Sequence, residues 1–352
     1  MIARTPITHA SRESPHVKIL TTHPKGHYRP WMERAVLLPG WLQDVERVEP
    51  NPLGFWRSLW WGWKLFRASR EFDAVVTGNE RAIQVFAMLQ QLVARRKKPH
   101  ILIYAFFDLP QRGFRRFLKR AYFRWLIMAN CCIVVYSRRR IDLYSRVFGV
   151  PKGKFVCVPY HTTLEGYHAT FKIKDSTVSE GDYIFAGGDY RDYKTFLDAV
   201  RDLPYEVVIA TRLKDYFTGL DIPKNVRVIT ASHEEFLQLM AGAKLVVVPL
   251  HGGVLHSGGE QTYLNAMALG KPVVVADDGG ADEYISDGVT GLVVRPSDAK
   301  DLRRALLSVL DNPSLARSLG QNARGVAATY SLDRFIQGIL ATVEACVDCG
   351  EQ

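Results

Sequence analysis

A glycine-rich loop in the second half of the chain has the composition of an anion-binding site. An apolar run ends at Pro249, and Gly258 and Gly259 stand immediately before a helical pattern that begins with residues 260–262. Glycines let a ligand approach the backbone closely, and the first N–H groups of a helix carry partial positive charge. The loop therefore predicts a site for an anion such as a diphosphate; the alternative is a set of tight turns without a ligand.

Several other polar side chains follow apolar runs and could take part in chemistry. His251 and His256 lie in the same loop, where either could contact a sugar or a phosphate. Asp108 follows an apolar run of the first half and could bind a ligand hydroxyl, act as a base or serve only as a turn residue. Ser232, with Glu235 three residues later, has the pattern of a capping box at the start of a helix.

The sequence lacks the common metal and phosphate motifs. It has no Asp-x-Asp pair, and its one Cys-x-x-Cys, at Cys346 and Cys349, has no second pair at zinc spacing. It also has no G-x-x-x-x-G-K-[ST] loop and no G-x-G-x-x-G run. We therefore expect no metal site and no cofactor, and neither a P-loop ATPase nor a standard dinucleotide site.

Short apolar runs alternate with helical patterns along the whole chain, which is typical of parallel sheets covered on both faces. The predicted strands are 17–22, 73–77, 101–106, 132–136, 155–158, 183–186, 205–210, 226–229, 245–249, 272–276 and 291–294. The predicted helices are 55–70, 81–96, 114–128, 139–148, 194–201, 233–241, 261–269, 298–310, 313–330 and 332–346.

A polar segment at residues 172–181 divides this alternation into two halves. We predict an α/β protein of two doubly wound Rossmann-like domains, residues 1–172 and 173–330, that face a cleft. A ligand is expected in the crevice at the carboxyl ends of the strands. The helix within residues 331–352 has no strand after it and could pack back on the first domain.

Charge is divided unevenly between the halves of this 352-residue chain. Residues 1–172 contain 29 Lys and Arg against 11 Asp and Glu, a net charge of +18, whereas the remainder carries −8. All seven tryptophans lie in the first half, and residues 51–70 and 111–128 combine aromatic and basic side chains at helical spacing. Such helices can lie on an anionic membrane surface, although ordinary packing would explain them too.

The composition, 47% hydrophobic and 23% charged, is that of a folded protein and excludes disordered, collagen-like and coiled-coil chains. No apolar run reaches 18 residues, and residues 1–15 lack an apolar signal core. We expect a cytoplasmic protein, peripheral on the cytoplasmic face of the membrane. Because no nucleic-acid module is present, nucleic acid is not an expected partner.

The stretch 246–294 resembles the nucleotide-binding domain of glycosyltransferases of the B-type two-domain fold, most closely the retaining family 4. The matching residues are Asn265-Ala-Met-Ala-Leu-Gly-Lys-Pro-Val-Val, Gly279-Gly280, Glu283 and Asp287-Gly-Val-Thr-Gly. The resemblance covers residues 182–330 well and 16–170 loosely. It implies that Gly188 ends the first strand of this domain and that Lys194 contacts the donor diphosphate, with Arg191 replacing the arginine that the family has at position 189.

This sequence departs from the family at other positions. The family's paired glutamates correspond to Ser257 and Asn265, so either Asn265 or Glu260 could bind the ribose. The family's histidine against the donor sugar is absent near Asp108. The resulting assignment to catalysis is Asp108, Lys194 and Arg191, and to donor binding Gly26, Gly188, Ser232, His251, His256, Ser257, Gly258, Gly259, Glu260, Gln261, Thr262 and Asn265.

The resemblance implies a glycosyltransferase of polysaccharide or glycolipid biosynthesis. It would move a sugar from a UDP- or GDP-linked donor to a lipid-linked or glycan acceptor, with retention and without metal. Two alternatives stay open: an inverting enzyme with Asp108 as base, and a non-catalytic partner subunit that binds nucleotide or membrane.

Overall fold

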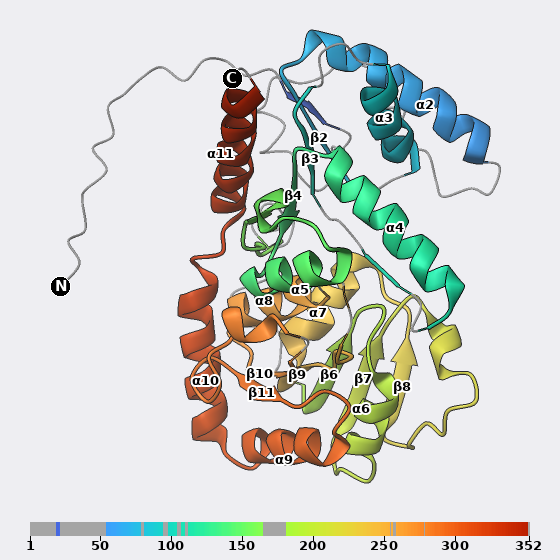
Figure 1. Ribbon diagram of the computed structural model, residues 1–352. Coiled ribbons are helices and arrows are strands. Elements are labelled where there is room, and N and C mark those ends of the chain that lie inside the picture. The colour runs from blue at the N-terminus through green and yellow to red at the C-terminus, as the bar shows by residue number, and fades with distance from the viewer. Residues whose placement is uncertain are drawn as a thin grey trace, which may run out of the picture.

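The computed structural model describes residues 19–21, 54–78, 81–93, 98–103, 107–109, 112–164, 181–253, 255, 258–277 and 279–350. These residues form two α/β bodies, one above the other in Figure 1. Gly26, His256, Ser257 and residues 172–180 of the expected linker lie outside the described residues.

The first body is built on a parallel sheet of strand order β1-β2-β3-β4-β5. Every residue of β2 and β4 is buried, as uninterrupted apolar strands require. Its strands are β1 (Ile19–Thr21), β2 (Ala74–Thr77), β3 (His100–Leu102), β4 (Cys132–Val135) and β5 (Phe155–Cys157). Its helices are α2 (Gly54–Ala68), α3 (Arg81–Leu92), α4 (Phe114–Ala129) and α5 (Arg138–Phe148).

The two faces of this sheet are covered by segments far apart in the chain. Val75, Leu102 and Ile133 share a core with α2, α3, α4 and α5. The alternate residues, such as Val76 and Val134, pack instead against α11 (Leu332–Gly350). Figure 1 shows α11, in red, running beside the first sheet, so the C-terminal helix completes the first body.

The second body contains a parallel sheet of order β11-β10-β9-β6-β7-β8. Its strands are β6 (Tyr183–Gly187), β7 (Glu206–Ala210), β8 (Val226–Ile229), β9 (Leu245–Val248), β10 (Val273–Ala276) and β11 (Leu292–Val294). Its helices are α6 (Tyr193–Val200), α7 (His233–Gly242), α8 (Glu260–Ala268), α9 (Ala299–Leu310) and α10 (Pro313–Ala327). The order in which strands are added reverses at β6 and β9, which stay parallel; α6 packs with α9, while α8 contacts both α7 and α10 on the opposite face.

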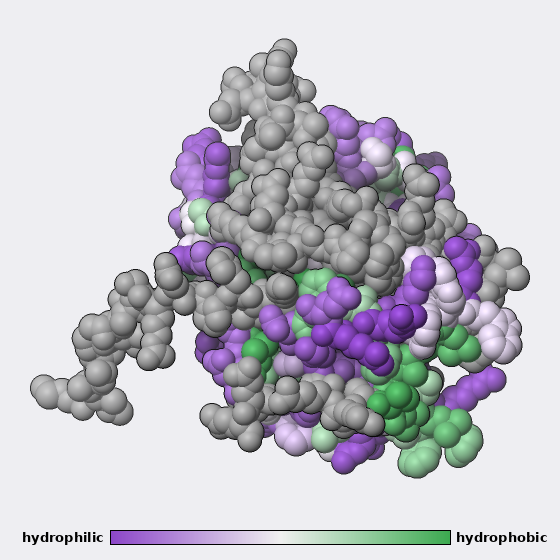
Figure 2. Space-filling model, turned by 90° about the horizontal axis from the view of Figure 1, so that it is seen from above, coloured by the Kyte–Doolittle hydropathy of each residue, from purple (hydrophilic) through white to green (hydrophobic). Residues whose placement is uncertain are grey.

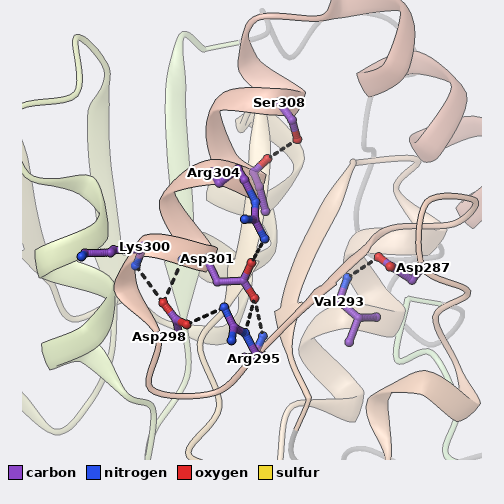
Figure 3. Close-up of polar contacts among 9 residues, drawn as sticks. Asp287, Val293, Arg295, Asp298, Lys300, Asp301, Arg304 and Ser308 are labelled. Atoms are coloured by element: carbon purple, nitrogen blue, oxygen red, sulfur yellow. Dashed lines mark hydrogen bonds and ion pairs between the residues drawn. The ribbon is translucent and has the colours of Figure 1, made fainter.

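The parallel two-body architecture predicted from the sequence is confirmed, and so are two helix starts. Ser232 accepts a hydrogen bond from the backbone N–H of Glu235, whose side chain accepts in return, so the predicted capping box is present. At the start of α9, Asp298 accepts from the N–H groups of Lys300 and Asp301, and Arg295 bonds both carboxylates (Figure 3). A cap of this kind contributes about 1 kcal/mol, and because these charges satisfy one another they serve the fold.

Candidate active site in the cleft between the sheets

A cleft of about 1030 Å³ lies between the two bodies, at the carboxyl ends of the second sheet's strands. The first body contributes Tyr136 and residues 160–163, and the second contributes residues that follow β6, β7, β8 and β9. The centre of this lining is the point where the strand order reverses, which is where open α/β sheets bind ligands. The volume is at the upper end of the range for small-molecule sites.

The N-terminus of α8 opens into this cleft. Gly259 is the N-cap of α8, with φ +105, and a side chain there would press on Val248 and Leu250. Gly258 to Thr262 all line the cleft. The first N–H groups of a helix have no partner within the helix, so this terminus is the place where the predicted anion site would lie; anion binding there stays a prediction.

Arg191 brings a positive charge to the same place. Its side chain is only 8% exposed, and its Nη2 lies 3.4 Å from the Thr262 Oγ1 of α8. Gly188 has φ +108, and a Cβ at that position would lie 2.8 Å from Arg191 Nη2. Glycine at 188 therefore leaves room for the Arg191 guanidinium between the end of β6 and the start of α8, and a Cβ there would push it aside.

A second cation faces the cleft from the end of β7, and the sequence reasoning missed it. Arg212 donates to Asp189 through Nε at 2.9 Å and Nη2 at 2.6 Å, and its backbone N–H bonds the same carboxylate at 3.1 Å. Thr211 Oγ1 donates to Asp189 at 3.0 Å. Burial raises the pKa of Asp189, but the hydrogen bonds from Arg212 and Thr211 outweigh it and hold the pKa below its usual range.

We compared the sequence and the structure with those of known proteins. Residues 189–326 match the family described as Glycosyl transferases group 1. The matched residues lie in the second body. An uncharacterized glycosyltransferase of Methanocaldococcus jannaschii is 24% identical over 186 residues, which are 50% of this chain and 52% of that protein.

Two further proteins illustrate the range of similarity. The GDP-mannose-dependent monoacylated alpha-(1-6)-phosphatidylinositol monomannoside mannosyltransferase of Corynebacterium glutamicum is 32% identical over 32% of this chain and 30% of its own length. The match therefore spans about half or less of these curated relatives. The structure of HepE from Anabaena in complex with UDP and glucose superposes with TM-score 0.69 at 16% identity, covering 94% of this chain and all of that one. The chain has the B-type glycosyltransferase fold.

Asn265 of α8 forms hydrogen bonds to Thr163 of the first body. It is 1% exposed; its Oδ1 accepts from Thr163 N–H at 2.9 Å, and its Nδ2 donates to Thr163 Oγ1 at 2.8 Å. Gln261 Nε2 also reaches Thr163 Oγ1, at 3.3 Å. Glu260 lines the cleft one turn away and is 9% exposed. Of the two ribose-binding candidates, Asn265 therefore has its amide engaged between the bodies.

Glu283, which the sequence analysis noted only as a motif residue, also joins the two bodies. Its carboxylate accepts from Ser137 Oγ at 2.6 Å and from the N–H groups of Arg138 and Arg139, both at 2.9 Å, so it caps α5. Burial raises its pKa, but these hydrogen bonds outweigh it and hold the pKa below its usual range. Next to it, Tyr284 Oη accepts from Tyr160 N–H at 2.9 Å.

The assigned residues divide into three groups by position. The cleft lining includes Gly188, Arg191, Ser232, Gly258, Gly259, Glu260, Gln261, Thr262 and Asn265. The described residues outside this lining are Asp108, Lys194 and His251. Gly26, His256 and Ser257 lie outside the described residues.

The three residues outside the lining have other surroundings. Asp108 is 62% exposed and pairs with Lys119 at 3.1 Å. Lys194 is exposed at the second position of α6. His251 Nδ1 lies 3.8 Å from Asp192, the N-cap of α6. Their roles in donor binding and catalysis stay predictions.

No group of three His, Cys, Asp or Glu side chains that could hold a metal occurs among the residues the structure describes. The expectation of a reaction without metal stays a prediction, because it depends on the chemistry at the diphosphate. The groups that could take a metal's place there are Arg191 and the N-terminus of α8.

Proposed function

We propose that this protein is a glycosyltransferase whose cleft binds a nucleotide sugar through its diphosphate. The observation that carries the proposal is the meeting of Arg191, Gly188 and the N-terminus of α8 at the switch point of the second sheet. A diphosphate would receive a guanidinium and helix N–H groups there. A hydrogen bond to a charged group contributes about 1.5–3 kcal/mol, so these contacts together would stabilise a departing nucleoside diphosphate.

In the proposed reaction the acceptor hydroxyl oxygen forms a bond to the anomeric carbon. The bond from that carbon to the diphosphate oxygen breaks, and the diphosphate leaves with the electron pair. The leaving diphosphate also takes the hydroxyl proton on the same face of the sugar, so configuration is retained. Arg191 and α8 would stabilise the charge that develops on the diphosphate.

We propose UDP or GDP as the nucleotide of the donor. HepE has been solved with UDP, and the corynebacterial relative is named as GDP-mannose-dependent. These names support a nucleoside diphosphate with a keto base for this chain. The identity of the sugar would be decided by the rest of the cleft, where residues 160–163 of the first body line the wall.

The proposed acceptor is a lipid-linked sugar or glycan, reached while the first body lies on an anionic membrane. On α2, Trp56 is 77% exposed, and Lys64 and Arg67 lie over the rings of Trp60 and Trp63. On α4, the exposed large apolar residues are Phe114, Phe117, Leu118, Trp125 and Met128. Figure 2 shows hydrophobic and strongly hydrophilic side chains next to each other on this side of the surface seen from above.

Aromatic side chains at headgroup depth and basic ones toward anionic lipid suit such a surface, for example the cytoplasmic leaflet. None of the helices described is long and apolar enough to cross a bilayer. We propose a peripheral contact, made by the exposed aromatic and basic side chains of α2 and α4.

A thermal-shift screen of nucleoside diphosphates, followed by NMR of an early product, tests the proposed function. Wild-type protein should be stabilised by UDP or GDP, and an α-linked donor should give an α-linked product. A β-linked product would support the inverting alternative. Stabilisation by nucleotide without any consumption of donor would support the non-catalytic alternative.

A further inference from the structure

We propose that Arg212 reads the nucleobase of the donor and selects keto bases, with Asp189 as its positioning residue. The inference rests on the proposed nucleotide-sugar site and adds a determinant of donor specificity to it. It starts from a contact that the sequence did not reveal: the ion pair between the ends of β6 and β7.

The Asp189–Arg212 pair differs from an ordinary surface ion pair. The Asp189 side chain is 16% exposed, and its carboxylate accepts four hydrogen bonds, two of them from the guanidinium. The Arg212 side chain is 81% exposed and lines the cleft. One edge of the guanidinium is thus fixed by a partly buried carboxylate, and Nη1 has no hydrogen-bond partner among the described residues. A planar fork held in this way is prepared to donate to a ligand.

The direction of the cleft indicates which part of the donor reaches Arg212. The diphosphate site lies between β6 and the helix after β9, because Arg191 and α8 meet there. From this point the lining continues after β7 and β8, at Arg212 and Ser232, whereas the described residues after β10 contribute only Leu332 of α11. Neighbouring strands are about 5 Å apart, so β7, the second strand from β9, is about 10 Å from it across the sheet, and Arg212 follows β7. The nucleoside therefore extends toward Arg212.

The chemistry of the bases makes the contact selective. Uracil carries a carbonyl oxygen where cytosine carries an amino group, and guanine carries one where adenine carries an amino group. A guanidinium only donates, so it bonds the carbonyls and is left unsatisfied, or repelled, by the amino groups. Arg212 would thus favour UDP over CDP and GDP over ADP.

Calorimetric titration of the full chain with UDP, CDP, GDP and ADP tests this inference. Wild-type protein should bind the keto member of at least one pair about tenfold or more tightly, and Arg212→Ala should reduce that ratio to near one. Arg212→Lys keeps a charge without the fork, so it should retain more overall affinity while losing most of the preference. Asp189→Asn should lower the preference partially, since it frees the guanidinium without removing it.

The matched control is Arg227→Ala, which removes an exposed arginine of β8 paired with Glu206 away from the cleft lining. This variant should keep both affinity and preference. A preference that persists in Arg212→Ala, or an equal loss for all four nucleotides, would overturn the inference. Wild-type protein that binds none of the four would contradict the proposed function itself, so the two failures are distinguishable.

Discussion

Arg191 is the side chain on which the proposed diphosphate site most depends, because it is buried next to the N-terminus of α8. Replacing it by alanine removes a charge-assisted hydrogen bond of about 1.5–3 kcal/mol, so the affinity for UDP or GDP should fall at least tenfold. Calorimetry on Arg191→Ala measures this loss. Unchanged affinity would show that α8 binds the diphosphate without Arg191.

The same titration on Lys194→Ala tests the other predicted cation. Lys194 is exposed on α6 and outside the cleft lining, so a loss of affinity in this variant would require α6 to approach the bound nucleotide.

Gly188 offers a test of whether Arg191 needs its observed position. Gly188→Ala would place Cβ 2.8 Å from Arg191 Nη2 at φ +108, so it should lower both the free energy of unfolding, by about 1–3 kcal/mol, and nucleotide affinity. Gly219→Ala is the matched control, because Gly219 has φ +80 and a Cβ added there would have no atom within 4 Å. The control should lose stability but bind nucleotide normally. Equal affinity in the two variants would contradict the role given to Gly188.

The roles of the site residues could be predicted only where a pattern within a few residues indicates them. Gly258 and Gly259 before α8, and Ser232 with Glu235 at α7, are signals within a few residues, and the structure has both. Arg212 was missed because its partner Asp189 is 23 residues away on another strand. No sequence spacing identifies such a pair.

At the scale of elements, α2 and α4 carry the proposed membrane contact. Trp60→Ala with Trp63→Ala, or charge reversal at Arg115, Arg116, Lys119 and Arg120, should reduce sedimentation with anionic vesicles. Each basic side chain near such a surface contributes about 1 kcal/mol, and the aromatic part should persist in salt.

Arg317→Glu on α10 is the control for the change in charge, since it is exposed on the second body. It should sediment like wild type. Wild-type protein that stays in the supernatant with anionic vesicles at low salt would show that α2 and α4 only pack against the fold.

The positions of helices and strands were predictable because burial of one face requires apolar residues at a regular spacing in the sequence. The strand predicted at 132–136 is β4 at Cys132–Val135, and the helix predicted at 298–310 is α9 at Ala299–Leu310. That α11 covers the first sheet was harder to predict, since the apolar face of an amphipathic helix does not specify which of two sheets it covers. The residues that decide it, such as Phe335 and Ile339, pack against side chains some 200 positions earlier, including Val134.

At the scale of the whole molecule, Glu283 ties the two bodies together and makes their association sensitive to acid. Its folded-state pKa is depressed, so its stabilising effect is present above the unfolded value of 4.5 and is lost as pH falls through the folded value. Glu283→Gln should lower the free energy of unfolding near neutral pH by about 0.5–1.5 kcal/mol, because solvent screens this exposed carboxylate. The variant should also lose less stability than wild type between pH 5 and pH 3.

Denaturant titration across this pH range is the measurement, and Glu344→Gln, an exposed carboxylate of α11, is the control. The control should follow wild type at every pH. Parallel pH profiles for wild type and Glu283→Gln would refute the cross-body cap.

The central claim, a glycosyltransferase that holds its donor diphosphate between Arg191 and α8, is tested most directly by release of nucleoside diphosphate. The full chain, with anionic vesicles that carry a lipid extract as acceptor, is incubated with UDP- and GDP-sugars, and the free nucleotide is measured by chromatography. We predict release of UDP or GDP by wild-type protein and a loss of at least tenfold in Arg191→Ala. Release that is equal in the two proteins, or absent from wild type with every donor, would contradict the account.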